Sequence, residues 1–117
     1  MPARNAAKAA PADKPMPADK SMAQLERKAA DAAALLKLLA NESRLLILCR
    51  LAVAGEASVG SLCDAIDLSQ SALSQHLAKM RLERLVATRR DAQTIYYRIA
   101  DQNAGRLLKV LKDIYCP

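Results

Sequence analysis

Two short helical segments, separated by a turn of a few residues, lie in the middle of this chain of 117 residues. Ser58 can cap the first segment and Ser69 can cap the second, because short polar side chains bond the free N–H groups at a helix start. The apolar positions of the second segment are Leu73, Leu77 and Met80. Two short helices joined by such a turn form a helix-turn-helix.

The hydrophobic periodicity changes from helical to alternating after this pair of helices. Residues 85–90 and 94–99 are rich in β-branched and aromatic side chains, and three residues (91–93) lie between them. This pattern predicts a β-hairpin. A helix-turn-helix followed by a basic hairpin is a winged helix.

Three further helices are predicted around this motif. Apolar residues spaced by three and four along residues 22–39 predict the first. The second, capped by Asn41 and ended by Gly55, is apolar nearly all round and is expected to be the central buried helix. Asp101 or Asn103 caps the last helix. Its apolar side carries Leu107, Leu111 and Ile114. The expected fold is mainly α, with five helices and a two-stranded β-hairpin wing.

Composition limits the domain organisation and the location. Residues 1–22 contain four prolines and no apolar stripe, which predicts a disordered tail before one domain over residues 23–117. The chain has 52% apolar residues but no Phe or Trp, which excludes aromatic platforms for single-stranded nucleic acid. No apolar run is long enough to span a membrane or to form a signal-peptide core. We therefore expect a cytoplasmic protein with reduced cysteines.

The positive charge is concentrated around the predicted hairpin. The formal net charge is +6, and residues 79–98 hold six basic and two acidic residues. The phosphates of double-stranded DNA are the obvious partner for such a stretch. On charge alone, an ordinary solvated face explains the stretch equally well.

The outward face of the second helix adds a reason to favour DNA. A helical wheel of about 100° per residue places short polar side chains opposite the apolar stripe. Gln can pair with adenine, and Ser can bond bases or phosphates without filling the major groove. The residues expected to contact DNA are Gln70, Ser71, Ser74, Gln75 and Lys79 on the helix, with Arg89 and Arg90 on the hairpin. His76, the single histidine, lies beside the apolar stripe and is expected to be structural.

Three stretches carry a resemblance to a known family, namely residues 38–45, 68–77 and 90–97. With them, residues 23–117 resemble the ArsR family of winged-helix repressors. The resemblance implies a homodimer joined through its first and last helices. It also implies repression of a two-fold symmetric operator in double-stranded DNA.

The metal ligands of that family are not matched here. Metal-sensing members place cysteines where this chain has Ser58, Val59 and Gly60. Others use Asp and His at the last helix, where this chain keeps Asp101 but has Asn103 at the histidine position. We therefore expect no transition-metal site and no cofactor.

A pair of thiols remains as the candidate sensor. Cys49 and Cys116 resemble the two cysteines of the family's persulfide-sensing branch. The resemblance implies that a persulfide, a polysulfide or an oxidant joins them and that DNA is then released. By residue pattern alone, Cys49 and Cys63 are typical core residues, whereas Cys116 lies beyond the last core position. Pairing requires Cα atoms within about 7 Å, which the sequence does not show.

The leading interpretation is a repressor that is not an enzyme and that senses reactive sulfur. A first alternative is a repressor whose thiolates bind a metal or arsenite. A second is a catalytic dithiol protein, which the lack of a Cys-x-x-Cys motif and of a βαβ pattern disfavours. A third is a protein-binding module whose basic face is incidental.

Overall fold

A computed structural model describes Pro15 and residues 20–116, so most of the predicted tail lies outside the described residues. The chain divides into two units, residues 1–32 and 33–117. The first unit holds α1 (Lys20–Arg27) and the start of α2 (Ala29–Leu39). Within the described residues, α1 starts at Lys20, inside the segment 1–22 that the sequence predicts as a tail.

The first predicted helix is two helices, separated at Lys28. The Lys28 N–H donates to the carbonyls of Gln24 (3.1 Å) and Leu25 (3.0 Å), which ends α1. The Lys28 carbonyl then accepts from the Ala32 N–H at 3.0 Å, which starts α2. The apolar spacing continues through this turn, so the sequence pattern alone did not reveal the break.

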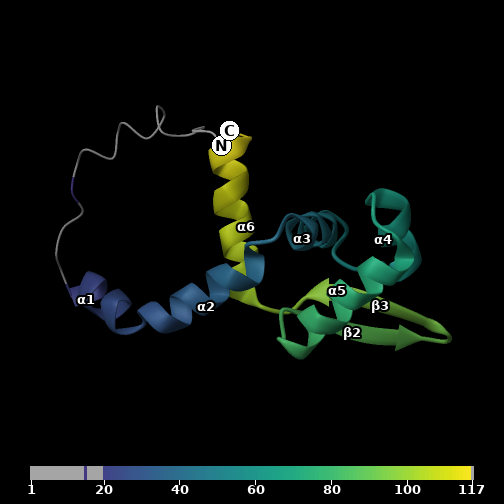
Figure 1. Ribbon diagram of the computed structural model, residues 1–117, viewed down its shortest axis with the longest axis horizontal. Helices are drawn as coiled ribbons and strands as arrows, with labels where there is room; N and C mark the ends of the chain where they lie inside the picture. The colour runs from purple at the N-terminus through teal and green to yellow at the C-terminus, as the bar shows by residue number, and fades with distance from the viewer. Residues whose placement is uncertain (1–14, 16–19, 117) are drawn as a thin grey trace. The chain divides into compact units, whose positions relative to one another are not determined.

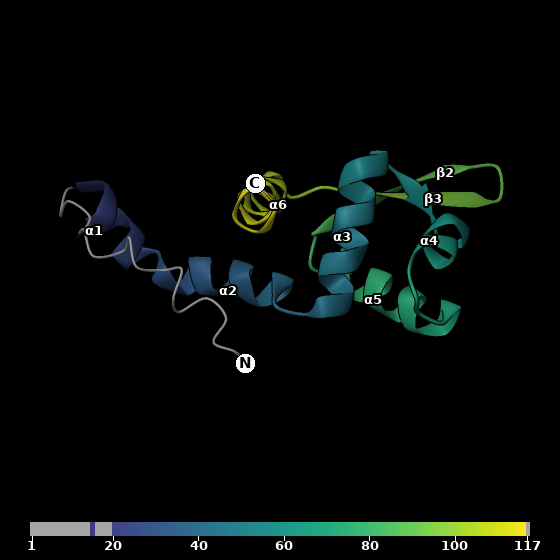
Figure 2. The same cartoon turned by 90° about the horizontal axis from the view of Figure 1, so that it is seen from above.

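The second unit is a winged helix-turn-helix with α3 at its centre. Its elements after α2 are α3 (Glu42–Ala54), β1 (Ala57–Ser58), α4 (Val59–Ala65), α5 (Gln70–Leu82), β2 (Val86–Asp91), β3 (Thr94–Ile99) and α6 (Gln102–Tyr115). In Figure 2, α3 lies between α6 on one side and α4, α5 and the hairpin on the other. The hairpin of β2 and β3 extends beyond the helices (Figure 1). The described residues form six helices and three strands, one helix and one strand more than expected.

The additional strand, β1, anchors the hairpin. The sheet order is β1-β3-β2, and all pairs are antiparallel. Ala57 lies opposite Tyr97 and Ser58 lies opposite Tyr96, so β1 pairs with the edge of β3 that β2 leaves open. A strand of two residues has no recognisable alternation, which is why the sequence pattern did not predict it.

The predicted helix caps are present. The capping side chains are Asn41 on α3, Ser58 on α4, Ser69 on α5 and Asp101 on α6. Each accepts a hydrogen bond from a backbone N–H two or three residues later, at 2.8–3.1 Å. Gly55 ends α3 with φ of 82°, a conformation that favours glycine. These caps set the helix lengths, and hence where α5 and the hairpin lie.

The core is aliphatic, as the composition predicts. Its fully buried large side chains are Ile47, Leu48, Leu51, Leu62, Leu73, Leu77, Met80 and Leu85. The three inward positions predicted for α5 are among them. Among the described residues, no helix is both long enough and apolar enough to cross a membrane.

Two helices bury less than the sequence pattern predicts. On α3, expected to be buried all round, Leu46 is 45% exposed and Val53 is 83% exposed. On α6, Ala104 and Leu108 face the core, whereas Ile114, on the predicted apolar side of the helix, is 60% exposed. The pattern identifies apolar residues but does not show whether they pack inside one chain or stay open to a second one.

Arg44 is the one charged residue buried among those described. It lies in the first turn of α3 and is 7% exposed. Its Nη1 donates to the Leu38 carbonyl oxygen at 3.1 Å and lies 3.1 Å from Oε1 of Glu83, the C-cap of α5. One guanidinium thus connects the end of α2, the start of α3 and the end of α5.

Replacing Arg44 with Met should lower the free energy of unfolding by about 2–3 kcal/mol, because Glu83 loses its partner and the Leu38 carbonyl loses its donor. Urea unfolding at one fixed protein concentration measures the loss. Arg50→Met on the exposed face of α3 is the matched control and should stay within about 0.5 kcal/mol of the parent. Equal unfolding midpoints for Arg44→Met and the parent would contradict the structural role.

Candidate nucleic-acid interface and thiol pair

The polar face of α5 is open to solvent. Its apolar face is fully buried, and this orients the helix so that the opposite side points away from the core. The exposed residues are Gln70, Ser71, Ser74, Gln75 and Lys79, all of which the sequence predicts as DNA contacts. The Ser69 hydroxyl accepts a hydrogen bond from the Ala72 N–H at 3.1 Å. The N–H groups before Ala72 in the first turn of α5 have no partner within the helix, as at every helix start. A row of short donors and acceptors on such a helix suits the edges of bases in a major groove.

His76 is half-buried at the edge of this face. It lies on α5 between the buried stripe and the open side, as the helical wheel predicts. This position fits packing between α5 and its neighbours better than contact with a base.

The two hairpin arginines differ from one another. Arg90 is exposed, and neither ion pair of the described residues involves it. The Arg89 guanidinium is held by Glu56, with Nε 3.1 Å from each carboxylate oxygen and a further contact from Nη2 to Oε1. It also lies over the ring of Tyr96, 4.7 Å from the centroid. Arg89, which the sequence predicts as a DNA contact, is thus paired with a carboxylate, whereas Arg90 is not.

The ion pair shifts the pKa of both partners. The hydrogen bond from Arg89 lowers the pKa of the Glu56 carboxyl, and the same bond raises the pKa of the Arg89 guanidinium. Both groups are therefore charged at neutral pH. Sequence reasoning missed Glu56, because it is 33 residues from Arg89 and no local pattern relates the two.

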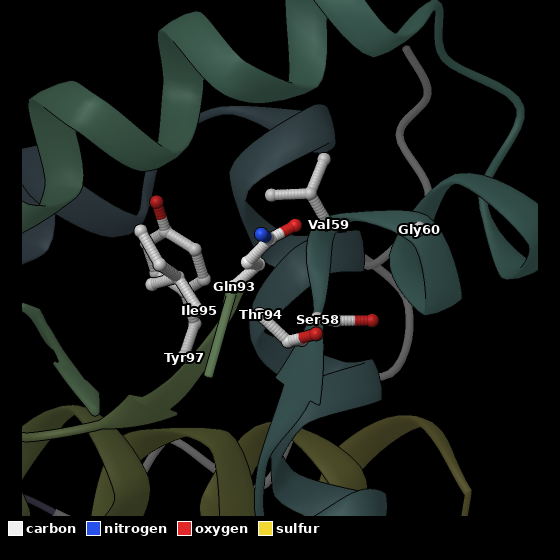
Figure 3. Close-up of a pocket in the computed structure, with 7 residues that line it drawn as sticks. All are labelled: Ser58, Val59, Gly60, Gln93, Thr94, Ile95 and Tyr97. Carbon is white, nitrogen blue, oxygen red and sulfur yellow. The ribbon is translucent and has the colours of Figure 1, made fainter. Parts of the chain in front are cut away.

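A shallow groove of about 440 Å³ lies between the start of α4 and the hairpin (Figure 3). It is lined by Ser58, Val59, Gly60, Gln93, Thr94, Ile95 and Tyr97. The first three are the positions at which the sequence resemblance would place cysteines in metal-sensing proteins. None of the seven lining residues carries a thiol, an imidazole or a carboxylate, so the groove offers no strong metal ligand.

The three cysteines are free thiols in different surroundings. Cys49 is exposed on α3, although its residue pattern is typical of a core position. Cys116 is exposed and forms the C-cap of α6, with its N–H bonded to the Lys112 carbonyl at 2.7 Å. Cys63 is half-buried on α4 and packs against the core. The structure thus leaves Cys49 and Cys116 accessible but does not join them.

Helices α3 and α6, which carry the exposed thiols of Cys49 and Cys116, contact one another. The buried residues of α6, Ala104 and Leu108, lie in its first half, whereas Ile114 and Cys116 at its end are exposed. Within the described part of the chain, no group of three or more His, Cys, Asp or Glu side chains could hold a metal ion.

Comparison with known proteins gives consistent relatives. Residues 41–88 match the family described as "Bacterial regulatory protein, arsR family". Transcriptional activator HlyU of Vibrio cholerae is 45% identical over 96 residues, covering 82% of this chain and 88% of that protein. The crystal structure of HlyU from Vibrio vulnificus is 48% identical, with a TM-score of 0.75 and coverage of 82% and 99%. The transcriptional repressor BigR from Xylella fastidiosa is 38% identical, with a TM-score of 0.76 and coverage of 82% and 97%.

These relatives are named as transcriptional regulators and not as enzymes. The family match over residues 41–88 covers the helix-turn-helix and the start of β2. The family resemblance found in the sequence is confirmed. The chain belongs to the ArsR family of bacterial regulatory proteins and is a DNA-binding transcriptional regulator similar to HlyU and BigR.

Proposed function

We propose that this protein is a homodimeric transcriptional repressor that binds a two-fold symmetric operator and releases it when sulfur joins Cys49 to Cys116. The observation that carries the switch is that these two thiols are free and exposed on two helices in contact, whereas Cys63 packs against the core. The family relationship supports the DNA binding, and the similarity to the transcriptional repressor BigR supports repression.

DNA binding is assigned to two surfaces of different character. The open face of α5 enters a major groove, where Gln70 and Ser74 read base edges. Arg90 on the exposed side of β2 contacts phosphate and adds affinity without sequence preference. Arg89 is already paired with Glu56 and therefore contributes less to phosphate binding than Arg90 does.

A second copy of the chain is the proposed partner of an apolar groove in the second unit. The groove has a volume of about 310 Å³. Its lining residues are Leu36, Leu39, Ala40, Leu45, Leu107, Val110 and Leu111. The exposed side chains of Ile114 and Tyr115 follow Leu111 on α6. A contiguous apolar surface of this kind is typical of an interface between subunits, and a dimer presents two copies of α5 to a symmetric operator.

The switch reaction balances with a trisulfide as the donor. The Cys49 thiolate attacks the central sulfur of R–S–S–S–R and displaces one RS⁻, which takes a proton. The Cys116 thiolate attacks the same sulfur and displaces the second RS⁻. The products are a Cys49–S–S–S–Cys116 link and two RSH, so the protein thiols are oxidised and the donor is reduced by two electrons. The order of the two attacks does not alter this balance.

The link is expected to act on DNA through the geometry of the dimer. A dimer reads half-sites about 34–36 Å apart, so a small change in the angle between subunits misplaces one α5 helix. A 100-fold loss of affinity corresponds to a coupling of roughly 3 kcal/mol, which is common for allosteric proteins.

Gln70→Ala should reduce the preference for operator over random DNA by about 1–3 kcal/mol, because a bidentate base contact is lost. Arg90→Gln should instead weaken binding to both DNAs alike and flatten the fall of log affinity with log salt. Fluorescence anisotropy over a range of salt concentrations measures both quantities. A Gln70→Ala protein that discriminates as well as the parent would place the recognition face elsewhere.

Val110→Glu should convert the dimer to a monomer and weaken operator binding, because it introduces a charge into the apolar groove. Sedimentation velocity measures the state of association. Val53→Glu makes the same change at an exposed position on α3 outside the groove lining and should remain dimeric. Dimeric Val110→Glu protein would show that the subunits meet through another surface.

Cys49→Ser and Cys116→Ser should each bind operator when reduced and keep it after treatment with a trisulfide donor. Cys63→Ser should release DNA as the parent does. Binding assays paired with intact mass spectra report release together with the mass increment of the link. If Cys63→Ser alone abolished release, the sensor would be Cys63. If zinc, copper(I) or arsenite released DNA and the donor did not, the inducer would be a metal or metalloid.

A further inference from the structure

We propose that Glu56 controls how much of the hairpin's positive charge is available to DNA, because it neutralises Arg89 and leaves Arg90 as the free phosphate contact. The inference rests on the proposed DNA binding. It assigns Glu56 as a positioning residue that limits non-specific affinity.

Glu56 and Arg89 form an ion pair with several hydrogen bonds. Both Glu56 oxygens lie 3.1 Å from Nε of Arg89, and Nη2 provides an additional bond. Contacts of two guanidinium nitrogens with one carboxylate give the pair a defined geometry, because the planar guanidinium matches the carboxylate. The side chains are only partly exposed, 48% for Arg89 and 34% for Glu56. Glu56 therefore engages the Nε and Nη2 groups of Arg89, which are donors of the kind that arginine offers to a phosphate.

The sheet explains why these side chains meet. Arg89 lies directly opposite Tyr96 on β3, and on the other edge Tyr96 lies opposite Ser58 of β1. Residues opposite one another in an antiparallel sheet share a face. Glu56 stands two residues before Ser58 and reaches across the same face to Arg89, with the Tyr96 ring beneath the guanidinium at 4.7 Å. The contact spans the sheet from the β1 side to β2.

Arg90 provides an internal comparison. Neighbouring residues of a strand point to opposite faces, so Arg89 and Arg90 project from opposite sides of the hairpin. The Glu56 carboxylate can therefore engage Arg89 and not Arg90. Two adjacent arginines thus have different electrostatic roles, one compensated and one available.

The consequence for DNA is a lower charge at the wing than the sequence indicates. A phosphate approaching Arg89 meets the Glu56 carboxylate as well, so counterion release at this position is suppressed. Glu56→Gln keeps the size of the side chain and an oxygen acceptor but removes the negative charge. Arg89 then becomes available to phosphate.

The test is a double-mutant cycle on the full-length protein with a labelled random-sequence duplex of about three helical turns. Glu56→Gln should raise affinity for this duplex and steepen the salt dependence by about 0.9 for each phosphate newly contacted. Arg89→Gln alone should change the slope less than Arg90→Gln. In the Glu56→Gln background, Arg89→Gln should return the slope to the parent value.

Asp67→Asn is the charge-matched control, because it removes one negative charge from an exposed turn residue that has no ion pair among the described residues. Its effect should be the same in the parent protein and in the Arg89→Gln background. A Glu56→Gln effect that is equally independent of Arg89 would overturn the proposal, as would an Arg89→Gln slope change equal to that of Arg90→Gln. If the parent showed no salt-dependent binding to any duplex, the DNA-binding proposal itself would fail, which is a separate result.

Discussion

A buried guanidinium holds the recognition helix in place. Arg44 has little contact with water, so its charge must be met by protein groups, and the Leu38 carbonyl and the Glu83 carboxylate meet it. These partners belong to the end of α2 and the end of α5. Through Arg44, the start of α3 therefore holds the end of α2 and the end of α5 in place. The polar face of α5 is useful only because these contacts and the aliphatic core define its direction.

Local rules account for most of the fold. Caps, apolar spacing and the change to alternation gave the helix-turn-helix and the hairpin, because each signal lies within a few residues of the structure it forms. Long-range pairings were not predictable in this way. β1 is too short to show alternation, and the partners Glu56 and Arg89 are 33 residues apart. The break between α1 and α2 was not predictable from the pattern, because the apolar spacing continues through Lys28.

In the candidate site too, features set by local sequence were predictable and features set by long-range contacts were not. The open face of α5 follows from a helical wheel, since the buried stripe fixes what lies opposite. The state of each hairpin arginine does not, because it depends on a carboxylate brought in by another strand. Cys49 shows a related limit: hydrophobic neighbours along α3 suggest burial, but the helix keeps one face open. The apolar composition of α3 predicts a buried helix, but the elements packed around it determine which of its residues are exposed.

The position of Cys116 has a mechanical consequence. Its sulfur belongs to the residue that closes α6, where the backbone N–H is still bonded to the Lys112 carbonyl. Helix ends fray more readily than helix centres. In the proposed switch, the distance that this thiol can move therefore depends on how many hydrogen bonds of the last turn of α6 open. Under that proposal, substitutions that strengthen or weaken the last turn of α6 would change how readily Cys116 is linked without altering the sulfur itself.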